Sequence, residues 1–236
     1  MLVLVSPTKT QKEFKGESQS DSLFTVKSNQ VLKILKSYSI KDLQKNMKLS
    51  DKLSESVYHG IQNHTKENIA INTYRGSSFN AMETTTWSDD DHRYAQDHLG
   101  ILSALYGIVR PFDTIGLYRL DFLMKFKLDL YDHWQATITD YLNTKGMPIL
   151  NLASQEYTRM INEKLLEVPL VKMDFKESSD KGFVSKSTYA KIARGHATQL
   201  IIKNRIQSIE AIKSLEFDNY SYNESLSDDS TLIFTR

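Results

Sequence analysis

The chain opens with five consecutive apolar residues, MLVLV at 1–5, which lead directly into a polar turn, SPTKT at 6–10. A strand without polar alternation is typical of a sheet that is covered on both faces, because neither face then meets water. The stretch PILNLAS at 148–154 has the same character. Strands of this kind among helical segments predict a layered architecture in which helices cover a sheet.

Hydrophobic periodicity predicts the other elements. Apolar residues at helical spacing predict helices over 31–38, 53–61, 94–105, 131–141 and 188–207. Strict alternation predicts a half-buried strand over 118–128, and NIAINTY at 68–74 resembles a strand in composition. Paired strands are expected within 168–187, and a last strand at 230–236. Because no repeat or linker divides the chain, we expect one compact domain over residues 1–236, of the α/β class with a mixed sheet and some α+β character.

Composition excludes several classes of protein. The 236 residues include no cysteine, which excludes disulfides and thiolate metal sites and favours a reducing cytoplasm. The pairs His59/His64 and His92/His98 do not share helical faces, so no metal site and no cofactor is predicted. No apolar run approaches the ~20 residues that a membrane helix needs. We therefore expect a soluble cytoplasmic protein, monomeric and without a membrane partner.

The charges are balanced overall but unevenly distributed. Thirty basic residues face 29 acidic ones, yet no carboxylate occurs between Asp180 and Glu210. On the helix predicted over 188–207, Lys191, Arg194 and Arg205 share one face. A solvated helix normally interleaves charges of both signs, and this one does not. The face is either an ordinary basic surface or a binding surface for phosphate oxygens.

The segment LSALYGIVRP at 102–111 has two interpretations. Gly107 can end a helix in the left-handed conformation, with Pro111 starting the next element. Alternatively, the turn belongs to a helix–hairpin–helix whose backbone N–H groups contact a phosphate, with Arg110 and Arg119 supplying charge. The segment itself leaves both interpretations open.

Polar residues follow the two buried strands. Ser6 and Lys9 follow the first, and Asn151, Ser154 and Tyr157 follow the second. Clefts at the carboxyl ends of strands are where open α/β sheets bind ligands, so these side chains are candidates for lining a cleft. Asn151 and Ser154 can equally serve as a helix cap. Asp121, between Arg119 and Lys125, is either a general base or a partner in a strand ion pair.

Taken together, the sequence resembles the YaaA family of bacterial peroxide stress response proteins. The matching stretches occur in the family's order and are SPTKT at 6–10, AQDHLGILSALYGIVRPFD at 95–113, YRLDF at 118–122, LYDHW at 130–134, LNLASQEY at 150–157, TYAKIARG at 188–195 and IIKNR at 201–205. The resemblance implies a cytoplasmic α/β protein of unusual topology with a central cleft. It also implies binding of double-stranded DNA, helped by a helix–hairpin–helix over 105–111, and protection from hydrogen peroxide and iron-driven DNA damage.

Carried over residue by residue, the resemblance makes Arg110, Arg119, Lys191 and Arg194 phosphate-facing, and places Lys9, Asn151, Ser154 and Tyr157 in the cleft. One loop departs from the family. Where the family often has Gly-Asp-Val-Tyr-x-Gly-Leu, this chain has GSSFNAM at 76–82, without the acidic residue and the second glycine.

Two functions remain in competition. The first is a DNA-binding protein of oxidative stress defence that contacts mainly phosphates. The second is an enzyme acting on a nucleotide, a damaged base or another small phosphorylated molecule, with Lys9 or Lys191 as nucleophile and Asp121 as acid or base. A protein that sequesters iron directly is disfavoured by the absent cysteines and the scattered histidines.

Overall fold

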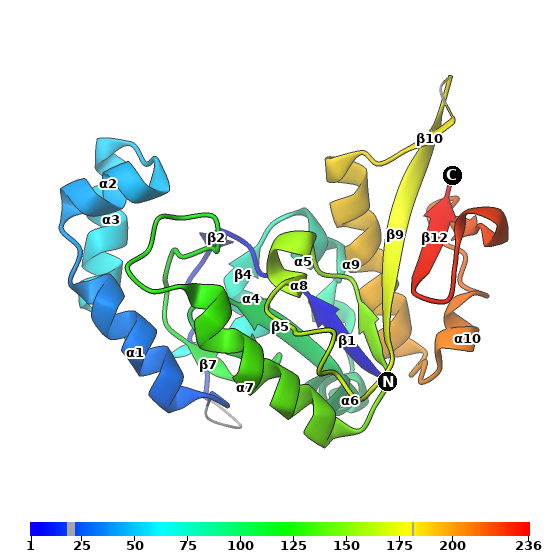
Figure 1. Ribbon diagram of the computed structural model, residues 1–236, viewed down its shortest axis with the longest axis horizontal. Coiled ribbons are helices and arrows are strands. Elements are labelled where there is room, and N and C mark those ends of the chain that lie inside the picture. Colours follow the sequence, from blue (N-terminus) through cyan, green and yellow to red (C-terminus); the bar gives the residue numbers. More distant parts are fainter. Residues whose placement is uncertain (18–21, 181) are drawn as a thin grey trace.

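The computed structural model describes residues 1–17, 22–180 and 182–236 (Figure 1). Within them, eight strands form one mixed sheet in the order β11-β12-β9-β8-β1-β5-β6, with β10 paired to β9. The strands are β1 Leu2–Val5, β5 Leu99–Ser103, β6 Gly107–Val109, β8 Ile149–Asn151, β9 Leu170–Ser179, β10 Gly182–Val184, β11 Ser221–Tyr222 and β12 Thr231–Thr235. Two small antiparallel pairs lie beside the sheet: β2 Thr10–Gln11 with β4 Tyr74–Arg75, and β3 Asn68–Ile69 with β7 Thr114–Ile115.

Helices surround this sheet. They are α1 Thr25–Lys36, α2 Ile40–Met47, α3 Asp51–Gln62, α4 Ala70–Thr73, α5 Ser77–Ala81, α6 Asp89–His98, α7 Leu130–Lys145, α8 Gln155–Thr158, α9 Ser187–Lys203 and α10 Ile209–Ile212, with short 3₁₀ turns at Thr84–Thr86 and Glu224–Leu226. In Figure 1, α7 crosses in front of the sheet and α6 lies behind it, so the sheet is covered on both faces. The α/β class with a mixed sheet is confirmed.

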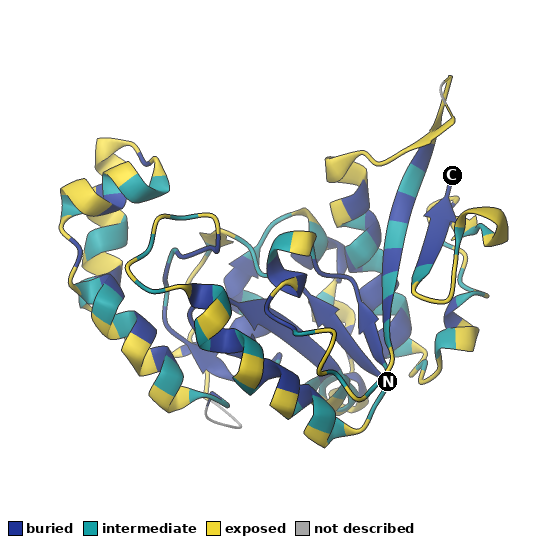
Figure 2. Ribbon diagram, in the orientation of Figure 1, coloured by how far each residue is buried: buried dark blue, intermediate teal, exposed yellow. Residues whose placement is uncertain are grey.

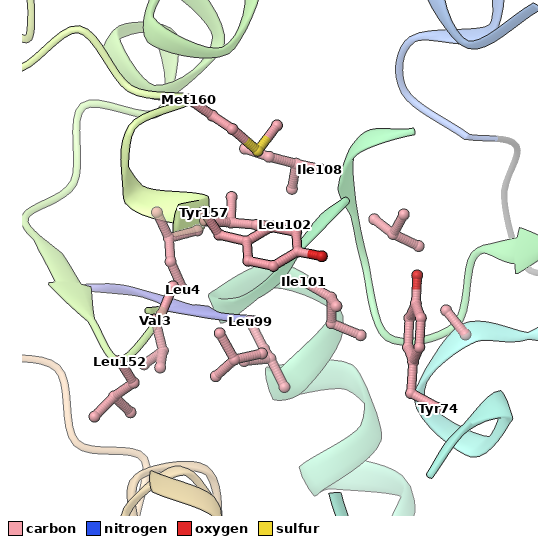
Figure 3. Packing of buried hydrophobic residues seen from close by; sticks show 14 of the residues in the cluster. Val3, Leu4, Tyr74, Leu99, Ile101, Leu102, Ile108, Leu152, Tyr157 and Met160 are labelled. Atoms are coloured by element: carbon pink, nitrogen blue, oxygen red, sulfur yellow. The ribbon is translucent and has the colours of Figure 1, made fainter. Parts of the chain in front are cut away.

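Strand β1 is the centre of the core, as its apolar run predicts. All four of its residues are buried, and it pairs in parallel with β5 on one side and β8 on the other. Figure 2 shows the buried central strands among helices whose outer surfaces are exposed. Figure 3 shows the side chains of Val3 and Leu4 among those of Leu99, Ile101 and Leu152.

The helix expected over 94–105 is wrong beyond its first half. Helix α6 ends at His98, and residues 99–109 form the antiparallel pair β5–β6, in which Ser103 lies opposite Gly107. All five residues of β5 are buried between β1 and β6, and a segment that is apolar on every side suits a strand as well as a helix. The helix–hairpin–helix at 105–111 is therefore wrong: the turn joins two strands.

The alternating segment 118–128 is not a strand either. Side chains, not a neighbouring strand, accept several of its backbone N–H groups: Tyr118 N–H donates to Gln11 Oε1 and Lys127 N–H donates to the Tyr38 hydroxyl, both at 2.9 Å. The stretch at 68–74 is a strand only at its ends, with α4 between β3 and β4. The other predicted elements are confirmed, including the paired strands β9 and β10, helix α9 and the last strand β12.

Candidate functional site

A cavity lies at the carboxyl ends of β1 and β8, where the strand order reverses. The chain leaves β1 for β5 on one side of the sheet, whereas β8 lies on the other side of β1. In open α/β sheets such a switch point leaves a crevice that binds ligands. The cavity has a volume of about 430 Å³ and is lined by residues from four segments, namely 5–10, 75–78, 152–157 and α9. We refer to it as the cleft.

Four cationic side chains line the cleft: Lys9, Arg75, Lys191 and Arg194. Lys9 Nζ lies 2.7 Å from Asp121 Oδ2, and Arg194 Nη2 lies 3.2 Å from Asp174 Oδ1. Within the described part of the chain, neither Arg75 nor Lys191 forms a salt bridge. The cleft therefore carries more positive charge than its own carboxylates compensate.

The guanidinium of Arg194 has one N–H donor, at Nε, that makes no hydrogen bond within the described residues. Its Nε is buried and has no hydrogen-bond partner among the described residues, although the same guanidinium binds Asp174. A buried N–H group without an acceptor is costly, and an anionic ligand would supply the missing acceptor. Arg194 also lines a second, more open cavity of about 710 Å³ on the other side of α8.

Serine side chains connect the two strand ends that form the cleft. Ser154 N–H donates to Ser6 Oγ at 2.8 Å, and the Ser6 hydroxyl lies 3.3 Å from Ser154 Oγ. On the opposite wall, Arg75 N–H donates to Thr8 Oγ1 at 3.0 Å and so joins β4 to the turn after β1. Ser6, Thr8 and Ser154 thus hold the walls in place.

Two protonatable side chains, Glu156 and Tyr157, line the cleft. Glu156 Oε1 accepts the Phe122 N–H at 3.1 Å, and burial, followed by the charge of Asp121, raises the pKa of Glu156. Burial also raises the pKa of Tyr157 well above its usual value, so its hydroxyl keeps its proton at neutral pH. In Figure 3 the Tyr157 ring lies over the core strands. The cleft can therefore donate protons and hydrogen bonds as well as positive charge.

A buried chain of hydroxyl groups lies beneath this region. The Tyr118 hydroxyl is 2.9 Å from the Tyr74 hydroxyl and 2.7 Å from Ser103 Oγ, and burial raises the pKa of Tyr118 to about 12. Sequence reasoning missed this chain, because its members come from β4, β5 and an irregular segment. It also missed Arg75, Ser77 and Ser78, which the pairing of β2 with β4 brings to the cleft. No local signal in those stretches indicates a site.

The structure brings together six of the candidate side chains. Ser6, Lys9, Ser154, Tyr157, Lys191 and Arg194 all line the cleft. Asp121 joins them through its ion pair with Lys9. Asn151 lines the neighbouring cavity, but its amide is used within the fold: Nδ2 donates to Thr158 Oγ1 and Oδ1 accepts the Ala153 N–H, at 2.8 and 2.9 Å.

The hairpin residues lie elsewhere. Gly107 is buried against α7, where a Cβ atom would meet Trp134 at 2.8 Å, so its backbone is not accessible to a phosphate. Trp134 Nε1 donates to the Ala104 carbonyl and covers the turn. The Arg110 guanidinium binds the buried Asp113 at 3.0 Å. These contacts stabilise the β5–β6 turn instead of presenting it to a ligand.

The other two predicted phosphate ligands are also outside the cleft. Arg119 lies partly buried on the segment between β7 and α7 and is not among the residues that line the cleft. Arg205 follows the carboxyl end of α9, with Nη2 3.4 Å from Asp91 Oδ1. Lys191 and Arg194 belong to the first half of α9, so the basic face predicted from periodicity is divided between two ends of one helix.

The described ranges hold neither a cluster of metal-ligating side chains nor a helix that could span a membrane. Residues 1–17, 22–180 and 182–236 contain no group of three or more His, Cys, Asp or Glu side chains placed to hold a metal ion. The helices in these ranges are too short or too polar to cross a membrane.

A family model and several known proteins match this chain over most or all of its length. A family model described as "Peroxide stress protein YaaA" matches residues 1–226. A UPF0246 protein of Finegoldia magna is 37% identical over 243 residues, covering all of this chain and 98% of the relative. UPF0246 proteins of Fusobacterium nucleatum and Francisella tularensis are 36% and 35% identical, over 247 and 254 residues, and cover all of this chain and 99% and 100% of the relatives.

Proposed function

The chain belongs to the family of the peroxide stress protein YaaA, and from this premise we propose that it acts in peroxide defence by binding double-stranded DNA through its phosphates. The cleft is the proposed phosphate site, and the bound protein limits iron-driven damage to the DNA in the cytoplasm. A role in peroxide stress follows from the family. The DNA contact is our proposal, and it does not involve a helix–hairpin–helix, because residues 99–109 form a pair of strands.

The observation that carries the proposal is the convergence of cations from three distant segments at the switch point of the sheet. Lys9, Arg75, Lys191 and Arg194 line one cavity, and the buried Arg194 Nε has no acceptor within the described residues. Guanidinium and ammonium groups in this arrangement match phosphate oxygens. Contacts of this kind read no base sequence, so we expect weakly sequence-specific binding that falls steeply with salt.

Substitution of Lys191 tests the proposal. Lys191 is exposed, and it has no salt bridge in the described structure, so Lys191→Glu leaves the fold intact. Binding of labelled duplexes of unrelated sequence, followed by fluorescence anisotropy, is expected to weaken by roughly tenfold for every sequence. The slope of log K against log salt is expected to fall by about 1 for the lost phosphate contact.

A matched control separates this effect from a change in net charge. Lys52 is exposed in the first turn of α3, outside the cleft, where a carboxylate is favoured by the helix N-terminus. Lys52→Glu is expected to bind DNA with the wild-type salt slope. Wild-type affinity in Lys191→Glu, or an equal loss in Lys52→Glu, would refute the assignment of the cleft.

The volume of the cleft favours a second candidate, an enzyme acting on a nucleotide or another small phosphorylated molecule. About 430 Å³ suits a small molecule and is too small for a duplex, of which only a phosphate or an extruded nucleotide can enter. The carboxyl of Glu156 and the Asp121–Lys9 pair would supply acid and base. Calorimetric titration with a mononucleotide tests this function: saturable binding to the wild type that Lys191→Glu abolishes supports it, and no heat of binding argues against it.

A further inference from the structure

Strand β9 continues beyond the body of the sheet as a two-stranded arm. Its register with β12 ends at Lys176, and residues 177–179 are in register with β10, although Ser178 N–H still donates to the Arg236 carbonyl at 2.7 Å. Figure 1 shows this arm, formed by the ends of β9 and β10, projecting above the sheet. The end of the arm is a two-stranded ribbon, which has no core of its own and therefore leaves its apolar side chains exposed.

One face of the arm continues the strand face from which Asp174 reaches the cleft residue Arg194. Side chains alternate along β9, which places Asp174, Lys176 and Ser178 on the same face. Phe183 lies opposite Ser178 in the antiparallel register and therefore shares that face. Asp174 reaches the cleft residue Arg194 at 3.2 Å. The ring of Phe183, 42% exposed, thus lies on the face of the strand from which Asp174 reaches a side chain of the cleft.

The chain after the arm places one exposed aromatic ring between two lysines. Lys186 and Lys191 are exposed, and Tyr189 between them is 43% exposed, with Lys186 Nζ 5.7 Å from its ring centre. No carboxylate occurs in the sequence from 181 to 209. In the described structure, Lys176, Lys186 and Lys191 form no salt bridge. The carboxylates of this region are Asp174, which binds Arg194, the exposed Asp180, and Glu177, which binds Arg236 and is close enough to Lys186 for their charges to interact.

Unpaired nucleic acid has the chemistry that fits this surface. Proteins that bind single strands combine cations that follow the phosphates with aromatic rings on which bases stack. A fully paired duplex offers phosphates to the cations but keeps its bases stacked on one another. A purely apolar protein partner would leave Lys176 and Lys191 without counter-charges.

We propose that the arm is a base-stacking element for an unpaired stretch of DNA, in which Phe183 stacks on a base while the phosphates of that strand lie along Lys176, Lys186 and Lys191 towards the cleft. This inference rests on the proposed function, because the cleft supplies the phosphate site from which the strand extends. It adds that the protein distinguishes DNA with exposed bases from an intact duplex.

The test compares two probes on the full chain, a fluorescein-labelled 12-nucleotide oligo-dT and a fully paired 12-base-pair duplex. Phe183→Ala is expected to weaken oligo-dT binding about fivefold or more and to leave duplex binding and the salt slope unchanged. Phe183→Trp restores oligo-dT binding, because the larger ring also stacks. Leu226→Ala, which removes another exposed apolar side chain (41% exposed) in the turn Glu224–Leu226, is the matched control and binds both probes like the wild type.

Several outcomes would overturn the inference. Wild-type affinity of Phe183→Ala for oligo-dT, equal losses on both probes, or the same loss in Leu226→Ala would each exclude base stacking by the arm. Lys191→Glu separates the two proposals: if it weakens both probes while Phe183→Ala changes neither, the cleft stands and the arm falls. If the wild type binds neither probe, both proposals fall.

Discussion

The close contact between α9 and α5 positions one wall of the cleft, and its tightness can be tested by substitution. A Cβ atom at Gly195 would lie 2.1 Å from the Ser78 carbonyl oxygen and 2.7 Å from Ala81 Cβ. An ordinary carbon–oxygen contact is about 3.3 Å, so Gly195→Ala must displace α5 by about 1 Å or more. Ser78 lines the cleft, so the substitution moves that wall as well.

The net effect is the difference of two opposing contributions. Alanine gains about 1 kcal/mol over glycine within a helix, and overpacking costs about 1–3 kcal/mol, more where the obstacle is backbone. The clash at Gly195 is with backbone, so we expect a net loss of about 1–2 kcal/mol. For a chain of 236 residues, this corresponds to a fall in Tm of roughly 2–8 °C.

Gly60 in α3 is the matched control. An added Cβ there meets nothing within 4 Å, and the residue is exposed. Gly60→Ala is therefore expected to raise the free energy of unfolding by up to about 1 kcal/mol, and Tm with it. Both variants are compared by scanning calorimetry under identical conditions. If Gly195→Ala matches or exceeds the Tm of the wild type, the tight α5–α9 contact is not what positions the cleft wall.

Two further predictions concern Arg110 and Glu156. Arg110→Ala removes the guanidinium from the buried Asp113 and is expected to cost about 2–4 kcal/mol in urea unfolding, with the DNA salt slope unchanged; a lost slope in a fully stable variant would contradict a structural role. The pKa of Glu156 is raised in the fold, so its contribution to stability is full below the unfolded-state pKa and is lost as pH rises through the folded-state pKa. Glu156→Gln therefore gains Tm relative to the wild type between pH 4 and pH 7, and a difference that is constant with pH would exclude this.

The central strands and the long helices follow from the sequence because each has a local signature of burial. The apolar runs at 1–5 and 148–154 predict β1 and β8, and apolar periodicity predicts α7 and α9. The site was partly predictable for the same reason: Ser6, Lys9 and Ser154 follow buried strands, and carboxyl ends of parallel strands meet at one edge of a sheet.

The amino-acid sequence alone therefore predicts which segments are buried and where the buried strands end. Tertiary structure decided which segments are partners. Residues 99–109 form two strands because β5 pairs with β1 and β6 pairs with β5. In the irregular segment 118–128, the side chains of Gln11, Tyr38 and Glu156 accept three of the backbone N–H groups. The tertiary structure likewise determines that Arg110 pairs with Asp113 and that Arg75 lines the cleft. Periodicity reports how much water a residue meets, whereas a hydrogen bond or an ion pair depends on which distant atoms the fold brings within about 3 Å.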